Sequence, residues 1–257
     1  MKLLSAIRSL IGVVACLLFL GVVAPLVLYF VVVPLIALGP GRRAELGTRW
    51  VSWVAKSLTS LLRLGGATID IEGTIDCAQA GVVIMNHQSV LEVPALIHIL
   101  RPRLPRFVAR SRYARRIPTV SRAISYLDCI VIDPRRDREG ALTAIKSAAE
   151  EGLHHAVMLF PEGHRTRDGE VAAFRPAGMI ALLEGRELPV STIVCDGFWR
   201  FRTVMNSFFG LGSVKGRLKV VDCATSPAKR EDLEPFIEER RQIMIRELAK
   251  MRAEAAH

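Results

Sequence analysis

The sequence has no paired cysteines. Five cysteines are scattered through its 257 residues, and none belongs to a Cys-x-x-Cys pair: Cys16, Cys77, Cys129, Cys195 and Cys223. This spacing excludes a disulfide framework and indicates no zinc site, so we expect no metal centre and a domain that folds in a reducing, cytoplasmic compartment. Cys129 and Cys195 lie in apolar runs and are expected to be buried small hydrophobic residues.

Two functional classes are disfavoured by further absences. No Gly-x-Ser-x-Gly motif is present, so chemistry through a covalent serine intermediate is not expected. No recognition module with interleaved basic and aromatic residues is visible, which argues against nucleic-acid binding. The net charge of +10 therefore favours another anionic partner, such as acidic lipid, a phosphate-bearing substrate or an acidic carrier protein.

Charge is also missing from a long interval near the N-terminus. Between Arg8 and Arg42 no residue is charged, and Leu, Val, Ile and Phe dominate. A bilayer crossing needs about 20 apolar residues, so the interval is long enough for a single crossing, and it is too long for the apolar region of a cleaved signal peptide. Pro25 and Pro34 leave open a re-entrant hairpin of two shorter helices. Basic residues on both flanks favour a folded domain on the cytoplasmic side of the membrane.

A second segment with membrane character follows Gly47 and Thr48. Trp50, Trp53 and several leucines recur at helical spacing, polar residues fill the opposite face, and a glycine pair that starts at Gly65 ends the pattern. Such a helix either packs on the domain core or lies in the membrane interface with its indole rings at headgroup level. We therefore expect a membrane-associated segment over residues 1–66 and a folded domain over residues 67–257.

Strand and helix patterns alternate from residue 67 onward. The alternation predicts an α/β fold with a mainly parallel or mixed sheet flanked by helices, in which ligands bind at the carboxyl ends of the strands. The predicted strands cover residues 67–71, 82–85, 106–109, 129–132, 156–160, 190–194 and 217–221. The clearest predicted helices cover residues 138–151, 178–183 and 231–253.

The loop after the second predicted strand contains a histidine and a carboxylate five residues apart. On one continuous helix, His87 and Glu92 would point about 140° apart and could not meet. The sequence from Ser89 to Glu92 has the form of a capping box, which leaves His87 in the loop and folds Glu92 back toward it. A neutral histidine held by a carboxylate can take a proton from a hydroxyl group, so the pair predicts acid–base catalysis.

A second charged loop follows the fifth predicted strand. Glu162 and Arg165 flank Gly163, whose backbone can turn sharply or approach a ligand closely. Arginine is the side chain best suited to hold a phosphate with two parallel hydrogen bonds. Arg175 then precedes a predicted helix and adds a cation near a helix N-terminus.

These loops resemble motifs of the glycerolipid acyltransferase family that includes 1-acylglycerol-3-phosphate O-acyltransferase. The family's Asn-His-x-x-x-x-Asp motif is similar to residues 86–92, and its Phe-Pro-Glu-Gly-Thr-Arg-Ser motif is similar to residues 160–166. A middle motif that usually ends Phe-Ile-Asp-Arg resembles residues 131–135, where Pro134 displaces the arginine to Arg135. Glu92 and His164 stand where the family usually has Asp and Thr. The resemblance covers about residues 67–222.

The resemblance implies a role for each of these residues. His87 would be the general base on an acceptor hydroxyl and Glu92 its orienting acid, while Glu162, Gly163 and Arg165 would belong to a glycerophosphate site. Arg135 or Arg136 would reach the acceptor phosphate. The donor would be an acyl thioester, either acyl-CoA or acyl carrier protein, and no cofactor or metal is implied.

The expected function is therefore transfer of a fatty acyl group to a lysophospholipid at a membrane. The first candidate for the acceptor is 1-acylglycerol-3-phosphate, which would give phosphatidic acid, and other lyso-lipids stay open because the arginine is displaced. The alternative class is a non-catalytic lipid-binding membrane protein that retains the fold. We expect the protein at the inner, cytoplasmic membrane with its folded domain on the cytoplasmic side.

Overall fold

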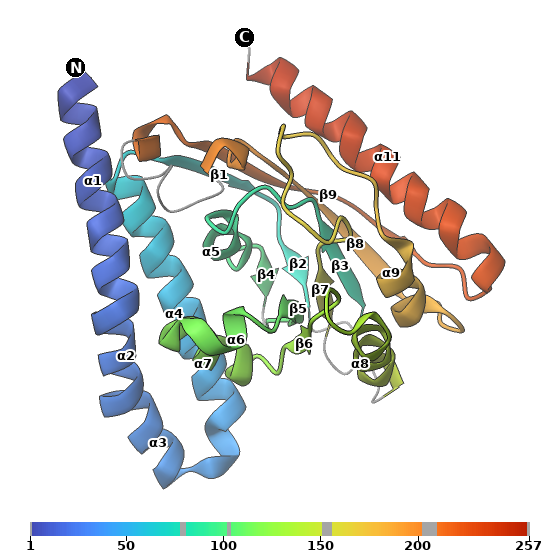
Figure 1. Ribbon diagram of the computed structural model, residues 1–257, viewed down its shortest axis with the longest axis horizontal. Helices are drawn as coiled ribbons and strands as arrows, with labels where there is room; N and C mark the ends of the chain where they lie inside the picture. The colour runs from blue at the N-terminus through green and yellow to red at the C-terminus, as the bar shows by residue number, and fades with distance from the viewer. Residues whose placement is uncertain (1, 78–80, 102–103, 151–155, 202–209, 256–257) are drawn as a thin grey trace.

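A mixed sheet of seven strands is the centre of the computed structural model, with helices on both of its faces (Figure 1). The structure describes residues 2–77, 81–101, 104–150, 156–201 and 210–255. The strand order is β1-β9-β8-β3-β7-β5-β6, and only the contact between β8 and β9 is antiparallel. The predicted α/β fold with a mixed sheet is confirmed.

All seven predicted strands are present, with ends that differ by up to a few residues. Their bounds are β1 (Thr68–Glu72), β3 (Val82–Met85), β5 (Arg106–Arg110), β6 (Ile130–Ile132), β7 (Val157–Leu159), β8 (Pro189–Asp196) and β9 (Lys215–Thr225). The two strands β2 (Ile75–Asp76) and β4 (Leu100–Arg101) form a separate small parallel sheet. Neither was predicted, because a strand of two residues is too short to show an alternating pattern.

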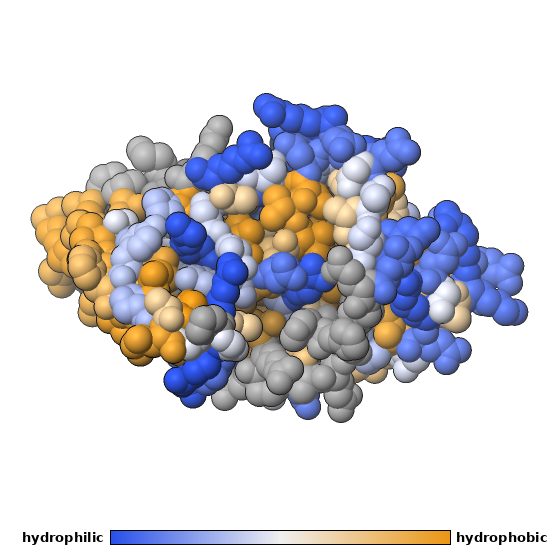
Figure 2. All heavy atoms as spheres, turned by 90° about the horizontal axis from the view of Figure 1, so that it is seen from below, coloured by the Kyte–Doolittle hydropathy of each residue, from blue (hydrophilic) through white to orange (hydrophobic). Residues whose placement is uncertain are grey.

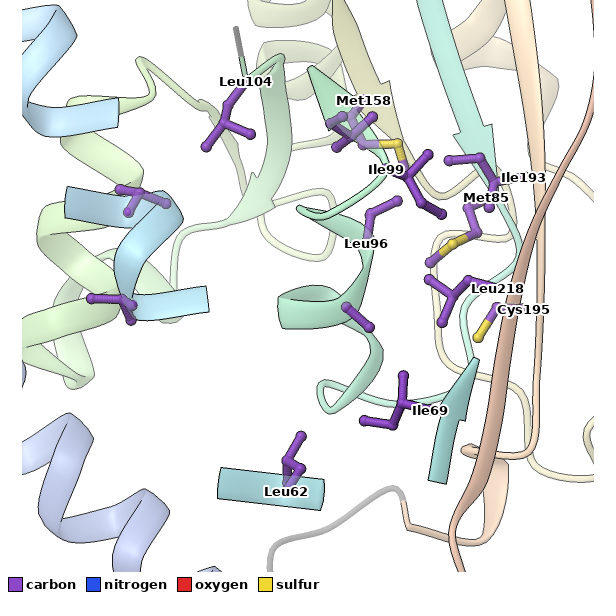
Figure 3. Close-up of a cluster of buried hydrophobic side chains, with 14 of the residues drawn as sticks. Leu62, Ile69, Met85, Leu96, Ile99, Leu104, Met158, Ile193, Cys195 and Leu218 are labelled. Carbon is purple, nitrogen blue, oxygen red and sulfur yellow. The ribbon is translucent and has the colours of Figure 1, made fainter. Parts of the chain in front are cut away.

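Strand β3 shows why the sheet has a core on each side. All four of its residues are buried, as expected for a parallel strand covered on both faces. Val83 and Met85 join one apolar cluster, and Val82 and Ile84 join the other. The period of two along the strand therefore divides a continuous apolar run between two hydrophobic cores. Figure 3 shows part of the first core, in which Met85 lies with side chains from neighbouring strands.

Three helices cover the face of the sheet that contains the second cluster. They are α8 (Arg138–Glu150), α9 (Pro176–Leu183) and α11 (Arg230–Glu254), and they correspond to the three predicted helices. Helix α9 begins two residues before its predicted start, since a proline fits the first turn of a helix, where its missing N–H is not needed. Glu151, the last residue of the first predicted helix, lies outside the described residues.

The N-terminal apolar segment forms one uninterrupted helical rod rather than two short helices. It runs through α1 (Lys2–Leu18), a π turn (Phe19–Val23), α2 (Ala24–Val27), a second π turn (Leu28–Val32) and α3 (Val33–Leu38). Each π turn lies directly before a helical stretch that begins with a proline at its first or second position, Pro25 or Pro34. The wider turn accommodates the ring and the missing N–H, so the prolines do not split the helix.

Helix α4 (Arg43–Leu64) returns alongside this rod after a short turn (Pro40–Arg42), so that the two form a helical hairpin (Figure 1). Gly12 and Gly65 meet at their crossing, where a Cβ on Gly12 would overlap the Gly65 Cα. Helix α4 starts at Arg43, six residues before the predicted helix, and includes Gly47 in its buried face. In Figure 2 the apolar surface gathers over the hairpin at the left, and hydrophilic residues cover the opposite end.

The two tryptophans of α4 have different environments. Trp50 is 3% exposed, donates a hydrogen bond from Nε1 to the Ala24 carbonyl oxygen at 3.3 Å, and meets Tyr126 of α7 (Pro118–Tyr126) edge to face. Trp53 is 38% exposed and packs against Phe19. Trp50 is therefore an internal contact between helices, because the rod and α7 enclose it, in agreement with the first of the two alternatives for this side chain.

Candidate active site

The carboxyl ends of β3 and β8 are joined by the side chain of Asn86. Its Nδ2 donates to the Cys195 carbonyl oxygen and its Oδ1 accepts from the Cys195 N–H, both at 2.8 Å. Asn86 is 1% exposed, so the two bonds are shielded from water. A buried amide that pairs with both backbone groups of one residue fixes the position at which the chain leaves β3.

His87 and Glu92 meet as the capping-box geometry predicted. The His87 Nδ1 lies 2.6 Å from Glu92 Oε1, and the carboxylate is fully buried while the imidazole is 18% exposed. Because an ionised carboxylate only accepts hydrogen bonds, this contact assigns the proton to Nδ1 and leaves Nε2 as the basic ring nitrogen. The ring also stacks on Phe160 at a centroid distance of 4.0 Å, which fixes its plane.

The short loop between His87 and Glu92 holds the carboxylate from the backbone side. Glu92 Oε2 accepts from the Ser89 N–H at 2.7 Å and from the Gln88 N–H at 3.0 Å. This is the half of the predicted capping box in which the glutamate reaches back. In the other half, the Ser89 hydroxyl oxygen accepts from the Leu91 N–H at 3.3 Å instead of from the Glu92 N–H, and the hydroxyl donates to the Phe201 carbonyl oxygen at 2.6 Å. Helix α5 (Glu92–Leu96) begins at Glu92.

A third buried group, the Cys195 thiol, lies against the same carboxylate. Its Sγ is 3.6 Å from Glu92 Oε2, and the residue is fully buried at the edge of the first apolar core (Figure 3). Burial, followed by the charge of Glu92, raises the pKa of this thiol well above its usual value. Cys195 is therefore a neutral S–H group, as its apolar sequence context predicted.

Glu162 is fully buried and holds the backbone of His87 through a hydrogen bond. Its Oε1 accepts from the His87 N–H at 2.6 Å, and its Oε2 accepts from the Ala172 N–H at 2.9 Å. Burial raises the pKa of this carboxyl to about 7, although both N–H bonds favour the charged form. Both of its oxygens are engaged and Glu162 has no exposed surface, whereas the sequence led us to expect this residue at a glycerophosphate. The sequence could not distinguish support of the His87 backbone from contact with a substrate, because a charged loop residue is compatible with both.

Arginines gather where β5, β6 and β7 end. Arg110 donates to the Gly163 carbonyl oxygen, and burial, followed by the positive charges of Arg112, Arg135 and Arg175, lowers the pKa of its guanidinium. Gly163 has a φ of +69°, and the Arg175 side chain crosses directly over its Cα, where a Cβ would meet Arg175 Cδ. Gly163 therefore allows the turn and the close passage of Arg175 together.

Two of the four predicted arginines lie near enough to Arg110 for their positive charges to lower its pKa. Arg135 and Arg175 belong to this group, Arg136 is exposed on the turn that follows Asp133, and Arg165 is half-buried in the loop after Gly163. Arg110 itself was missed by the sequence reasoning. Its position directly after a predicted strand, at the edge where ligands bind in such sheets, was the available signal.

Comparison with known proteins shows the family and the fold of this chain. The Acyltransferase family model matches residues 68–196, half of the chain, and the chain belongs to this family. It is 26% identical over 139 residues to human 1-acyl-sn-glycerol-3-phosphate acyltransferase beta, which covers 53% of this chain and 49% of the relative. It is 25% identical over 148 residues to 1-acyl-sn-glycerol-3-phosphate acyltransferase of Borreliella burgdorferi, covering 57% and 59%.

The matched region thus spans about half the length of these curated relatives. The fold is also that of a solved structure, the 1-acyl-sn-glycerophosphate (LPA) acyltransferase PlsC from Thermotoga maritima. The TM-score is 0.71 with 19% sequence identity, and the match covers 98% of this chain and 96% of the other. The shared fold therefore includes the N-terminal hairpin as well as the family domain.

Proposed function

We propose that this protein is a membrane-associated enzyme that transfers a fatty acyl group from an acyl thioester to the hydroxyl of a lysophospholipid, with 1-acylglycerol-3-phosphate as the acceptor. The observation that carries the proposal is the 2.6 Å contact between His87 Nδ1 and Glu92 Oε1, beside a group of arginines. The named activity of both curated relatives supports the choice of acceptor.

His87 is the general base in the proposed reaction. Its Nε2 takes the proton of the acceptor hydroxyl while the hydroxyl oxygen attacks the thioester carbonyl. The tetrahedral intermediate then breaks its C–S bond, and the departing thiolate takes the proton from the imidazolium and leaves as the thiol. Glu92 keeps the proton on Nδ1 and stabilises the imidazolium that forms. Positioned proton transfer of this kind contributes about 10²–10⁴ in rate. The thioester is already activated, so the proposed step requires no metal or cofactor, and the acyl carrier is a co-substrate.

Arginines supply the proposed site for the acceptor phosphate. Arg135 and Arg175 lie close enough to Arg110 for their charges to lower the pKa of its guanidinium. A phosphate dianion would relieve that repulsion and accept paired hydrogen bonds from the guanidinium groups. We propose Arg165 and Arg136 as further contacts, and Gly163 as the position where the backbone passes closest to the phosphate. We assign Glu162 to support of the His87 backbone.

The helical hairpin is the proposed membrane attachment. Residues 3–38 form a helix that is long and apolar enough to cross a membrane, and an 18-residue stretch of it has a mean hydropathy of 2.8. The folded domain contacts this rod at Ser9, whose hydroxyl accepts from the Gly212 N–H, and at Leu20, whose carbonyl oxygen accepts from the Thr119 hydroxyl. A perpendicular crossing would pull these contacts into the hydrocarbon, so we propose that the rod lies along one leaflet.

The proposed location is the cytoplasmic face of the inner membrane. Basic residues on both flanks of the rod, from Arg8 to Arg42 and Arg43, are consistent with both ends of the apolar segment on the cytoplasmic side. This places the proposed phosphate site on the same side as soluble acyl-CoA and acyl carrier protein. It also lets a lysophospholipid enter from the leaflet that holds the hairpin.

A thiol-release assay tests this function. Purified protein in lipid vesicles is supplied with acyl-CoA or with acyl carrier protein, against a panel of lysophosphatidic acid and lysophospholipids with larger headgroups. Thiol release that depends on lysophosphatidic acid supports the proposal and identifies the donor. Release only with another lyso-lipid changes the acceptor but retains the reaction, and no release with any pair favours a lipid-binding protein without transferase activity.

A further inference from the structure

The C-terminal helix α11 presents two arginines to the loop that follows the Glu162 motif. Arg241 and Arg252 are 11 residues apart, which at about 100° per residue places them on the same face of the helix. Both contact the segment between residues 169 and 172. This loop carries no residue of the proposed chemistry, so its attachment to α11 needs a separate explanation.

One connection runs from Arg241 to the backbone of His87. Arg241 Nε donates to the Ala172 carbonyl oxygen at 3.0 Å. The Ala172 N–H in turn donates to Glu162 Oε2 at 2.9 Å, and Glu162 Oε1 accepts from the His87 N–H at 2.6 Å. Three consecutive hydrogen bonds therefore link the helix to the proposed base, and the carboxylate in the middle is fully buried.

A second connection runs from Arg252 to Glu92. Arg252 donates to both carboxylate oxygens of Asp196, from Nε at 3.1 Å and from Nη2 at 3.2 Å, and also donates to the Gly169 carbonyl oxygen at 2.8 Å. The buried Gln88 side chain contacts the same two acceptors through Nε2, at 3.2 Å to Asp196 and 3.3 Å to Gly169. The Gln88 N–H then donates to Glu92 at 3.0 Å.

Gln88 is held on its other side as well. Its Oε1 accepts from the Phe198 N–H at 3.0 Å, so both ends of the amide are bonded. The guanidinium of Arg252 fixes Asp196 and Gly169, which are the acceptors that orient Gln88. Because the neighbouring backbone N–H groups of Gln88 and Ser89 hold the Glu92 carboxylate, a rotation of Gln88 would move that carboxylate relative to the imidazole.

We propose that Arg241 and Arg252 are positioning residues through which α11 aligns the His87–Glu92 pair. Arg241 acts on the histidine backbone and Arg252 acts on the glutamate, so the one helix sets the geometry of both partners. Neither arginine touches a reacting atom. The kinetic part of this inference rests on the proposed transferase function, whereas the geometric part does not.

Substitution by methionine removes each guanidinium and keeps an apolar stem. In Arg252→Met and Arg241→Met, we expect kcat for thiol release to fall about 10- to 100-fold with little change in the acceptor KM, because small displacements of reacting groups cost that much. Arg252→Lys retains one ion pair with Asp196 but not the forked contacts, and should recover part of the rate. The matched control is Lys219→Met, which removes the 2.7 Å contact of Lys219 with Glu247 of α11 without reaching the loop.

A spectroscopic measurement on the full-length protein separates this inference from the proposed function. The Nδ1 proton of His87, bonded to Glu92, should give a low-field ¹H resonance in histidine-labelled wild-type protein, assigned by its absence in His87→Ala. The signal should persist in Lys219→Met and broaden or disappear in Arg241→Met and Arg252→Met. Signals and rates that match the wild type, or losses equal to those of Lys219→Met, would overturn the inference. A wild type that transfers no acyl group contradicts the proposed function, and the proton signal still decides the positioning role.

Discussion

At the scale of single residues, buried polar groups set the geometry of the site. Asn86, Gln88, Glu92 and Glu162 are each at most 1% exposed, and each bonds to backbone groups of strand β8 or of the segments that follow β3, β7 and β8. Unpaired polar groups cost about 1–3 kcal/mol when buried, so these side chains can adopt few alternative arrangements. The rigid frame holds His87, whose imidazole remains partly accessible.

Glu162 gives the stability of the protein a specific pH dependence. Its pKa in the folded protein is about 7, above the value of 4.5 for an unperturbed carboxyl. A group with a raised folded pKa contributes stability that is complete below the unfolded pKa and is lost as the pH rises through the folded pKa. Between pH 4.5 and 7, the shift corresponds to on the order of 3 kcal/mol.

Substitution of Glu162 by glutamine should remove this dependence. Urea titrations of wild type at pH 4.5 and pH 7.5 should show a free energy of unfolding that falls relative to Glu162→Gln as the pH rises. The variant should also be less stable at low pH, because its amide NH₂ faces one of the two backbone N–H groups. A constant difference between the two proteins across this range would contradict the raised pKa.

Asn86 offers a second test at this scale. Asn86→Ala leaves the buried N–H and carbonyl groups of Cys195 without their partner and should lower the free energy of unfolding by about 2–4 kcal/mol. Asn86→Asp retains the acceptor but sets an oxygen against the Cys195 carbonyl, so it should not restore stability at neutral pH. Urea midpoints of the three proteins measure this. If Asn86→Asp had the wild-type urea midpoint, the hydrogen bond from Asn86 to the Cys195 carbonyl oxygen would contribute nothing to the free energy of unfolding.

The sequence predicted the local part of the site and not its long-range part. His87 and Glu92 are five residues apart, so the backbone bonds of one turn were enough to bring them together. Arg110 reaches Gly163 across 53 positions, and its place depends on the pairing of β5 with β7. Glu162 was expected at the substrate because its charge, but not its burial, can be read from the residues.

At the scale of elements, long patterns were predictable and close packing was not. Strand β3 is a continuous apolar run, β8 is rich in β-branched residues, and α11 carries a pattern more than six turns long. Helix α4 was predicted from its apolar face alone, so its first six residues were missed. The glycine contact between the rod and α4 was invisible as well, because it joins residues that are 53 positions apart.

The contact of Gly12 with Gly65 predicts a difference between two glycines of the same rod. Gly12→Ala places a methyl group on the Gly65 backbone and should reduce stability by about 1–3 kcal/mol, as overpacking does. Gly21→Ala meets nothing within 4 Å and should stabilise the helix by up to about 1 kcal/mol. Thermal unfolding in one detergent compares them, and equal shifts in Tm would show that the hairpin does not pack at this crossing.

At the scale of the whole molecule, the proposed position of the rod in one leaflet can be measured. Leu4 and Phe30 are 75% and 77% exposed, and they are about 39 Å apart along the helix axis, more than the thickness of the hydrocarbon core. Spin labels on Leu4→Cys and Phe30→Cys, in a background without reactive cysteines, report depth in vesicles. We expect similar depths for both labels. Labels at opposite surfaces of the bilayer would establish a crossing.

The architecture of the whole molecule also joins the proposed catalytic loops to the proposed membrane attachment. The mixed sheet brings the loops after β3, β5, β7 and β8 to one edge, and the hairpin is attached to the same domain (Figure 1). The proposed base, phosphate site and lipid contact therefore lie on separate parts of the chain. The base is the part without which the proposed reaction stops.

The most direct test of the account is the rate of thiol release in His87→Ala, measured in vesicles with the best donor and acceptor pair. We expect a loss of about 10²–10⁴ in kcat with an unchanged thermal midpoint, because the base is removed and the frame around it remains. Glu92→Gln should also lose most of the activity. A His87→Ala protein that releases thiol at the wild-type rate would contradict the central claim.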